Sequence, residues 1–260
     1  MGENLKSQGV LFLDADNTLW DTNGVYSEAQ MRLLSRIENQ VERVADASDR
    51  LAYLRAFDQG LAERHHAGLR YPPRFLIKAL SMALTGMDER DAIRRSWSGG
   101  QDDARIPNDF VDQTEEQYFQ DLRQMPALRL GVLEGLLRLS EQPISLRIVT
   151  EGNRDRVKKI VQGHGIDSWF SQIIEIRKTQ PTFARLFAAA GSPQFALMVG
   201  DQLDRDIQPA KAAGLGTIYF PGAFRPKWEV QETDVHPKYI ISTFSEVPDI
   251  VTKELSRTND

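Results

Sequence analysis

Two carboxylates stand one residue apart directly after the first strongly apolar segment of the chain. Asp14 and Asp16 follow the run Val10–Leu13, whose composition is typical of a buried strand. Carboxylates at the end of a buried strand are costly unless something pairs with them. Their position therefore indicates a functional site. Two such carboxylates can bind a cation, act as a nucleophile or transfer a proton.

Other polar side chains follow the later apolar runs in the same way. They are Thr150, Glu151 and Gly152 after the second run, Lys178 after the third, and Asp201, Asp204 and Asp206 at and after the fourth. In open parallel sheets the ligand site lies at the carboxyl ends of the strands. We therefore expect these residues to meet Asp14 and Asp16 at one edge of a sheet.

Electrostatics limits what such a site can be. Several carboxylates in one cleft raise each other's pKa, and a hard divalent cation such as Mg²⁺ relieves their repulsion. Lys178 adds a positive charge, and Thr150 and the backbone near Gly152 add neutral hydrogen-bond donors. This combination suits phosphoryl transfer, in which positioning and charge neutralisation dominate catalysis.

The two aspartates then take different roles. Asp14 is the candidate nucleophile, which would form an aspartyl-phosphate intermediate. Asp16 is the candidate general acid for the leaving oxygen and then the base for the hydrolytic water. Asn17 and Thr18 are expected to hold the turn between strand and helix through local side-chain hydrogen bonds. Asp204 is expected to be a loop or helix-cap residue.

The elements that must position these residues follow from the hydrophobic pattern. Strands are expected at 9–14, 144–150, 171–176, 195–201 and 216–220, and helical patterns that end at glycines separate the later ones. Alternation of strand and helix predicts an α/β fold, with a mostly parallel sheet and helices on both faces.

The segment after the first strand has a different pattern. From about residue 24 it carries helical patterns, the first expected to start at Ser27, and almost no strand-like runs. We therefore expect a core made of residues 1–23 and 126–260 and an inserted all-helical domain made of residues 24–125.

Composition excludes several classes of function. The 260 residues include no cysteine, which rules out disulfides, thiolate metal sites and cysteine nucleophiles. A net charge of −5 argues against bulk binding to nucleic acid or anionic membranes. The polar N-terminus and the lack of long apolar runs favour a cytoplasmic protein, while the sequence says nothing of oligomeric state.

The motifs resemble those of the haloacid dehalogenase superfamily, over about residues 1–24 and 126–222. "DADNTL" is similar to its first motif, Thr150 in "IVTEGN" to the second, Lys178 in "RKTQPTF" to the third, and "VGDQLDRDIQPAKAAG" to the fourth. The resemblance implies a Rossmann-like core, with the inserted helices forming a cap that selects the substrate.

The resemblance also implies roles for single residues. Asp14, Asp201 and the backbone carbonyl of Asp16 would bind Mg²⁺, and Asp206 would support the metal through water or the loop backbone. Thr150 and Lys178 would hold the phosphoryl group. Glu151 and Gly152 complete the phosphate-binding set, with Glu151 either facing the phosphate or pointing away from it.

Two departures and several alternatives remain. In the family a proline usually follows the lysine of the third motif, whereas Thr179 and Gln180 come first here, and Glu151 stands where a small or amide residue is usual. The leading interpretation is a Mg²⁺-dependent phosphatase acting on a small phosphorylated metabolite. The alternatives are dehalogenation, phosphoglucomutase-type transfer and a non-catalytic scaffold, and Asp16 argues against dehalogenation because dehalogenases of the family lack it.

Overall fold

The protein divides into two compact units. The computed structural model describes residues 8–63, 71–98, 106–191, 193–225 and 230–257. One unit, the core unit, comprises Met1–Asn23 and Met125–Asp260, and the other, the helical unit, comprises Gly24–Gln124. Within the described ranges, no helix is long and apolar enough to cross a membrane.

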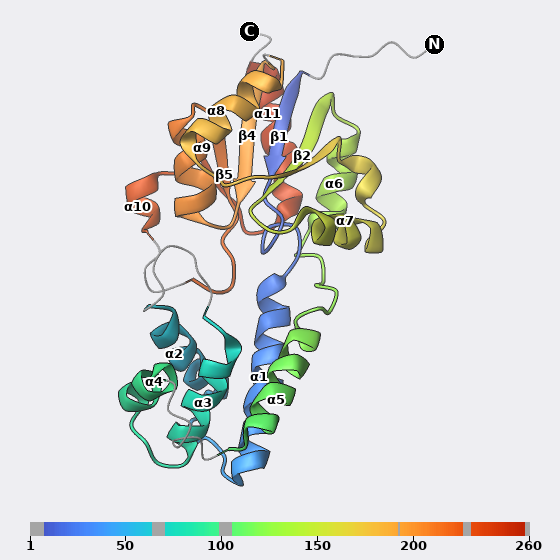
Figure 1. Cartoon of the computed structure of the whole chain (residues 1–260). Helices are drawn as coiled ribbons and strands as arrows, with labels where there is room; N and C mark the ends of the chain where they lie inside the picture. Colours follow the sequence, from blue (N-terminus) through green and yellow to red (C-terminus); the bar gives the residue numbers. More distant parts are fainter. Residues whose placement is uncertain (1–7, 64–70, 99–105, 192, 226–229, 258–260) are drawn as a thin grey trace. The chain divides into compact units, whose positions relative to one another are not determined.

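A parallel sheet forms the centre of the core unit (Figure 1). Its strands are β1 (Gly9–Leu13), β2 (Ile144–Thr150), β3 (Gln172–Glu175), β4 (Phe195–Gly200), β5 (Gly216–Tyr219) and β6 (Tyr239–Ile240). They lie in the order β3-β2-β1-β4-β5-β6, and every pair is parallel. The predicted α/β class is therefore confirmed, and β6 is an addition that the sequence did not reveal.

The first strand lies in the middle of this sheet. Gly9 is in register with Ile144 of β2 on one side and with Phe195 of β4 on the other. All five residues of β1 are buried, because both faces of the sheet are covered. The residues that follow β1 are thus fixed between the ends of its two neighbours.

Helices cover both faces, and successive β1 side chains reach different cores. Leu11 and Leu13 pack with α6 (Val132–Ser140), α7 (Arg154–Gly163) and α11 (Val247–Arg257). Val10 and Phe12 pack with α8 (Gln180–Ala189) and α9 (Gln208–Ala212). The shorter elements are the 3₁₀ turns Asp167–Trp169 and Phe244–Glu246, the π-helical turn η4 (Leu203–Ile207) and α10 (Glu232–Val235).

The helical unit has a core of its own. Its helices are α1 (Thr22–Val41), α2 (Arg50–Ala62), α3 (Pro73–Leu84), α4 (Glu89–Trp97) and α5 (Asn108–Asp121). Leu33, Phe57 and Leu80 are among the side chains buried between these helices. The predicted start of the first helix at Ser27 is wrong: the helix begins at Thr22, and the backbone N–H of Asn23 donates to Asn17 Oδ1 at 2.8 Å.

Two segments that flank the helical insertion pair with each other inside the core unit. The backbone N–H of Asp21 donates to Ala127 O at 2.8 Å, and that of Arg129 donates to Leu19 O at 3.1 Å. Trp20 and Leu128 form an antiparallel bridge. The turn that carries Asp16 is therefore tied to the segment where the chain re-enters the core unit.

Candidate active site

Asp14 is anchored where β1 ends. Its backbone N–H donates to Val199 O at 2.9 Å, which continues the pairing of β1 with β4 by one residue. The buried side chain accepts hydrogen bonds on both oxygens, from Thr18 Oγ1 at 3.0 Å on Oδ2 and from Lys178 Nζ on Oδ1. Thr18 thus holds the carboxylate of Asp14.

A tight turn positions Asp16. Asn17 has a φ of 60°, a left-handed conformation that asparagine tolerates better than most residues, and its N–H donates to Trp20 O at 2.8 Å. Asp16 Oδ1 accepts from the Trp20 indole at 3.0 Å and from Thr22 Oγ1 at 2.5 Å. A Cβ at Gly152 would lie 3.3 Å from Oδ2, so the other oxygen of Asp16 faces Gly152.

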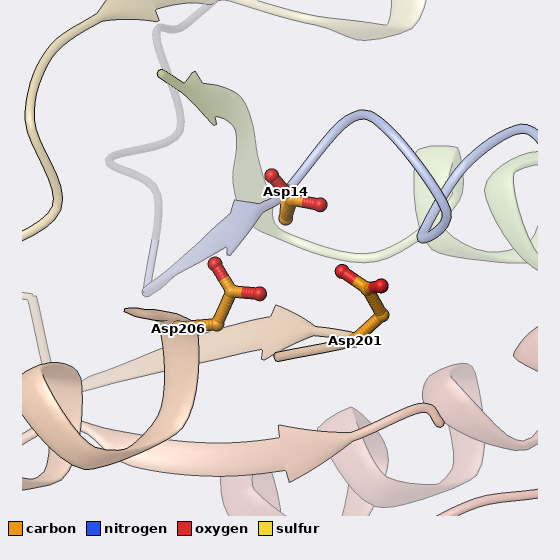
Figure 2. A group of neighbouring side chains, drawn as sticks. All are labelled: Asp14, Asp201 and Asp206. Carbon is orange, nitrogen blue, oxygen red and sulfur yellow. The ribbon is translucent and has the colours of Figure 1, made fainter. Parts of the chain in front are cut away.

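The segment after β4 supplies two more carboxylates. Asp201 directly follows the strand, and Asp206 lies in η4, so both side chains return to the end of β1, as Figure 2 shows. Single π-helical turns often occur at functional sites. Gly200 makes room for Asp206, because a Cβ at Gly200 would lie only 2.3 Å from that of Asp206.

Lys178 joins the two ends of this group. Its Nζ donates to Asp14 Oδ1 and, at 2.6 Å, to Asp206 Oδ1, while the N–H of Gln202 donates to Asp206 Oδ2 at 3.0 Å. Only 5% of the Lys178 side chain is exposed. Burial acts to lower the pKa of Lys178, but Asp14 and Asp206 outweigh it and raise that pKa, so the ammonium stays charged.

The three aspartates fit a metal ion. Asp14, Asp201 and Asp206 each offer an oxygen, all within 4.8 Å of one another. Burial raises the pKa of Asp14 to about 7 against the pull of Lys178, and burial with the neighbouring Asp14 and Asp206 raises that of Asp201 well above its usual value. Within the described part of the chain, buried Asp201 Oδ1 finds no hydrogen-bond donor. A divalent cation would satisfy that oxygen and offset the excess negative charge.

Thr150, Glu151 and Gly152 follow β2 on the other side of β1. Thr150 Oγ1 accepts from the N–H of Gly152 at 2.9 Å and keeps its own hydroxyl proton to donate. Glu151 accepts from the backbone N–H of Lys178 at 2.9 Å and from Arg205 Nη1 at 2.9 Å. Its negative charge is therefore directed to these two partners.

Most of the predicted site residues meet as their spacing suggested. Asp14, Lys178, Asp201 and Asp206 form one buried group, and Thr18 is bonded to it. Asp204 is exposed, but it lies within η4 and not in the loop or helix cap that was expected. Arg205 and Arg129 were missed as partners of site residues. Sequence spacing could not reveal these two arginines, because each donates hydrogen bonds to a loop that is distant from it in sequence.

Comparison with known proteins places the chain in a family. The family model of haloacid dehalogenase-like hydrolases matches residues 9–214. A glyceraldehyde 3-phosphate phosphatase of Pyrococcus furiosus is 22% identical over 252 residues, covering 94% of this chain and 93% of the relative.

Solved structures show the same fold at low identity. A haloacid dehalogenase-like family hydrolase from Xanthomonas campestris has a TM-score of 0.61 at 18% identity, covering 98% of this chain and 99% of the other. The HAD-hydrolase YfnB of Bacillus subtilis, bound to magnesium, has a TM-score of 0.59 at 21% identity, covering 95% and 100%. With the matched family model spanning most of its length, this chain belongs to the haloacid dehalogenase-like hydrolases and is an enzyme of that class.

Proposed function

We propose that the protein is a Mg²⁺-dependent phosphatase that hydrolyses a small phosphomonoester through an aspartyl-phosphate intermediate. The observation that carries this proposal is the position of Lys178, which bonds the candidate nucleophile Asp14 and the supporting Asp206 at once. Beside this group, Asp16 stands two residues after the nucleophile with one oxygen held and the other facing Gly152.

The phosphate would be received by the donors around Asp14. Lys178 offers a positive charge, and the Thr150 hydroxyl, whose oxygen accepts from the Gly152 N–H, offers a neutral donor. Glu151 would act indirectly, because its carboxylate accepts from the Lys178 backbone. We therefore assign Glu151 to holding the loop of Lys178.

In the first step an oxygen of Asp14 attacks phosphorus, and the bond from phosphorus to the leaving oxygen breaks. Asp16 gives its proton to that oxygen, so the product leaves as an alcohol. In the second step Asp16 takes a proton from water, the water oxygen attacks phosphorus, and the acyl-phosphate bond breaks. Inorganic phosphate is released and Asp14 is regenerated.

A metal ion would bind at the carboxylates of Asp14 and Asp201 and the backbone carbonyl of Asp16, with Asp206 in support. Bound there, Mg²⁺ would supply charge neutralisation for the phosphoryl oxygens. The buried Asp201 Oδ1, which finds no donor among the described residues, supports this assignment. So does the fold shared with YfnB, whose structure was solved with magnesium.

The relatives support a small phosphorylated metabolite as the substrate. A relative that spans nearly the whole chain acts, by its name, on glyceraldehyde 3-phosphate, which is a small phosphorylated metabolite. Dehalogenation is disfavoured by Asp16, since a halide leaving group needs no proton. A non-catalytic scaffold is disfavoured because no group of the proposed mechanism is missing. Phosphoryl transfer to a sugar stays an alternative that product analysis would reveal.

Hydrolysis of p-nitrophenyl phosphate with and without Mg²⁺ tests the proposal. Asp14→Asn should abolish turnover, and Asp204→Asn, an exposed aspartate near Asp206, is the matched control that should retain it. Asp16→Asn should keep some reaction with this activated ester but lose turnover of alkyl phosphates by about 10²-fold or more. Full activity in Asp14→Asn would refute the assigned nucleophile.

A further inference from the structure

Arg129 is a half-buried arginine that holds three backbone carbonyls with one guanidinium. Nη1 donates to Asn17 O and, at 3.1 Å, to Phe220 O, and Nη2 donates to Pro221 O at 2.7 Å. The guanidinium carbon lies 3.5 Å from the centre of the Phe220 ring, which fixes the plane of the fork. Such a set of bonds needs the planar, multiply donating head group that only arginine has.

The carbonyls that Arg129 joins belong to two loops of the candidate site. Asn17 directly follows Asp16 and has the left-handed backbone of the turn. Phe220 and Pro221 follow β5, and the next residue, Gly222, lies beside Asp201, because a Cβ there would come within 3.3 Å of Asp201 Oδ2. Arg129 thus links the turn after the candidate general acid to a loop beside the metal-binding carboxylate.

The turn is also held by backbone pairing with residues 127–129 and by the buried Trp20, but the surroundings of Asn17 are open on the Arg129 side. A cavity of about 240 Å³ opens there, and its lining includes Asn17, Asp21, Asn23, Arg129 and Gly222. The guanidinium donates directly to the Asn17 carbonyl and so restrains it from this open side. The same turn brings Trp20 round so that its indole donates to Asp16 Oδ1.

We propose that Arg129 is a positioning residue for Asp16, which fixes the turn 16–20 so that the proton-donating carboxyl keeps its direction. The proposal deepens the proposed phosphatase function and rests on it for its kinetic consequence. Its structural consequence, a fixed Trp20 indole beside Asp16, is independent of the reaction. The two consequences are measured separately.

The variants are chosen to separate positioning from stability and charge. Arg129→Met removes the fork and keeps an apolar side chain over Phe220, and Arg129→Lys keeps the charge and removes the fork. Arg138→Met is the matched control, because Arg138 also donates to a backbone carbonyl outside its own helix, Ser245 O of a 3₁₀ turn at 3.0 Å, and pairs with Asp249 far from the candidate site in sequence.

The structural measurement is the NMR signal of the Trp20 indole N–H, assigned with Trp20→Phe. In Arg129→Met and Arg129→Lys the signal should shift and exchange with water at least about tenfold faster, whereas Arg138→Met should leave it unchanged. If Arg129→Met fails to fold, Arg129→Lys decides. An unchanged indole signal in a folded Arg129 variant would overturn the proposal.

The kinetic measurement compares leaving groups in the presence of saturating Mg²⁺. With an alkyl phosphate, kcat of both Arg129 variants should fall at least about tenfold further than with p-nitrophenyl phosphate, since only the poor leaving group needs the proton of Asp16. Equal losses with both esters, together with a raised Mg²⁺ requirement, would show that Arg129 acts on Asp201 instead. If the wild-type protein hydrolyses neither ester, the proposed function fails and the indole signal alone decides the role of Arg129.

Discussion

The Lys178 ammonium donates a 2.6 Å hydrogen bond to Asp206, and both side chains are almost completely buried. The same ammonium also bonds Asp14, so it is shared between two carboxylates. A buried charge that loses its partner costs about 3–5 kcal/mol. The Lys178 ammonium is therefore expected to serve both the candidate active site and the stability of the fold.

Lys178→Met should destabilise the protein by about 3 kcal/mol and abolish phosphatase activity, because it leaves two buried carboxylates without their shared partner. Urea unfolding measures the free energy. Lys211→Met is the control, since Lys211 donates, among the described residues, to the backbone carbonyls of Val235 and His236 and to no carboxylate. A variant as stable as the wild type would contradict the interpretation.

Gly200→Ala should displace Asp206. The new Cβ would lie 2.3 Å from Asp206 Cβ and 2.4 Å from its Cγ, which the end of β4 cannot relieve without moving. We expect a loss of about 1–3 kcal/mol in unfolding free energy and a large loss of kcat. Gly216→Ala is the control. A Cβ at this position would lie 2.5 Å from the Cδ2 atom of Leu197, so the variant should lose stability but keep activity.

Glu151→Ala should impair turnover more than Arg205→Ala. Glu151 accepts both from the Lys178 backbone and from Arg205, whereas the half-exposed Arg205 side chain contributes, within the described residues, the ion pair with Glu151 alone. Exposed ion pairs contribute little, about 0–1 kcal/mol, so loss of the Lys178 backbone contact should dominate. The check is kcat for both single variants and the double variant. A larger effect of Arg205→Ala would show that Arg205 itself contacts the substrate.

Acid should weaken the packing of α11 through Glu254. Burial acts to raise the pKa of this carboxyl, but hydrogen bonds from Lys238 at 2.7 Å and Tyr239 at 2.6 Å outweigh it and lower the pKa below 4.5. A lowered folded-state pKa means that the contribution is complete above pH 4.5 and is lost as the pH falls through the lowered value.

Glu254→Gln therefore should be less stable than the wild type at pH 7 by about 1 kcal/mol, and the difference should shrink as the pH falls toward 3. Urea unfolding over this range measures both proteins. Glu141→Gln, at the exposed end of α6, should show no such pH-dependent difference. A constant gap between wild type and Glu254→Gln would contradict the pKa direction.

Local pattern predicted most of the sheet. The runs that form β1 and β4 are buried at every residue, and such continuous apolar runs are readable in a sequence. The run that forms β2 is buried mainly at its carboxyl end, at Ile148–Thr150. The two-residue β6 carries too little pattern to be seen. The helical pattern does not locate the start of α1. The first turn of α1 is capped by Asn17, which lies before the pattern and whose side chain accepts from the N–H of Asn23.

The site was predictable where its residues follow strands and less so elsewhere. Asp14, Thr150 and Asp201 are located by strand ends alone. The direction of the Glu151 side chain depends on where Arg205 and the Lys178 backbone lie, and those positions arise only when three loops meet. The place of Arg129 beside the turn depends on the pairing of Trp20 with Leu128, which the local pattern does not show.

The central position of β1 has a consequence for how the chain is made. The ribosome releases this strand before the other strands of the sheet, yet its neighbours begin only at Ile144 and Phe195, and Asp14 meets Lys178 across 164 positions. Until β2 and β4 have been synthesised, the apolar β1 has no neighbouring strand to pair with, and exposed apolar strands favour aggregation. The inserted helices can form their own core during that interval, which shortens the effective chain that must close before β1 is paired.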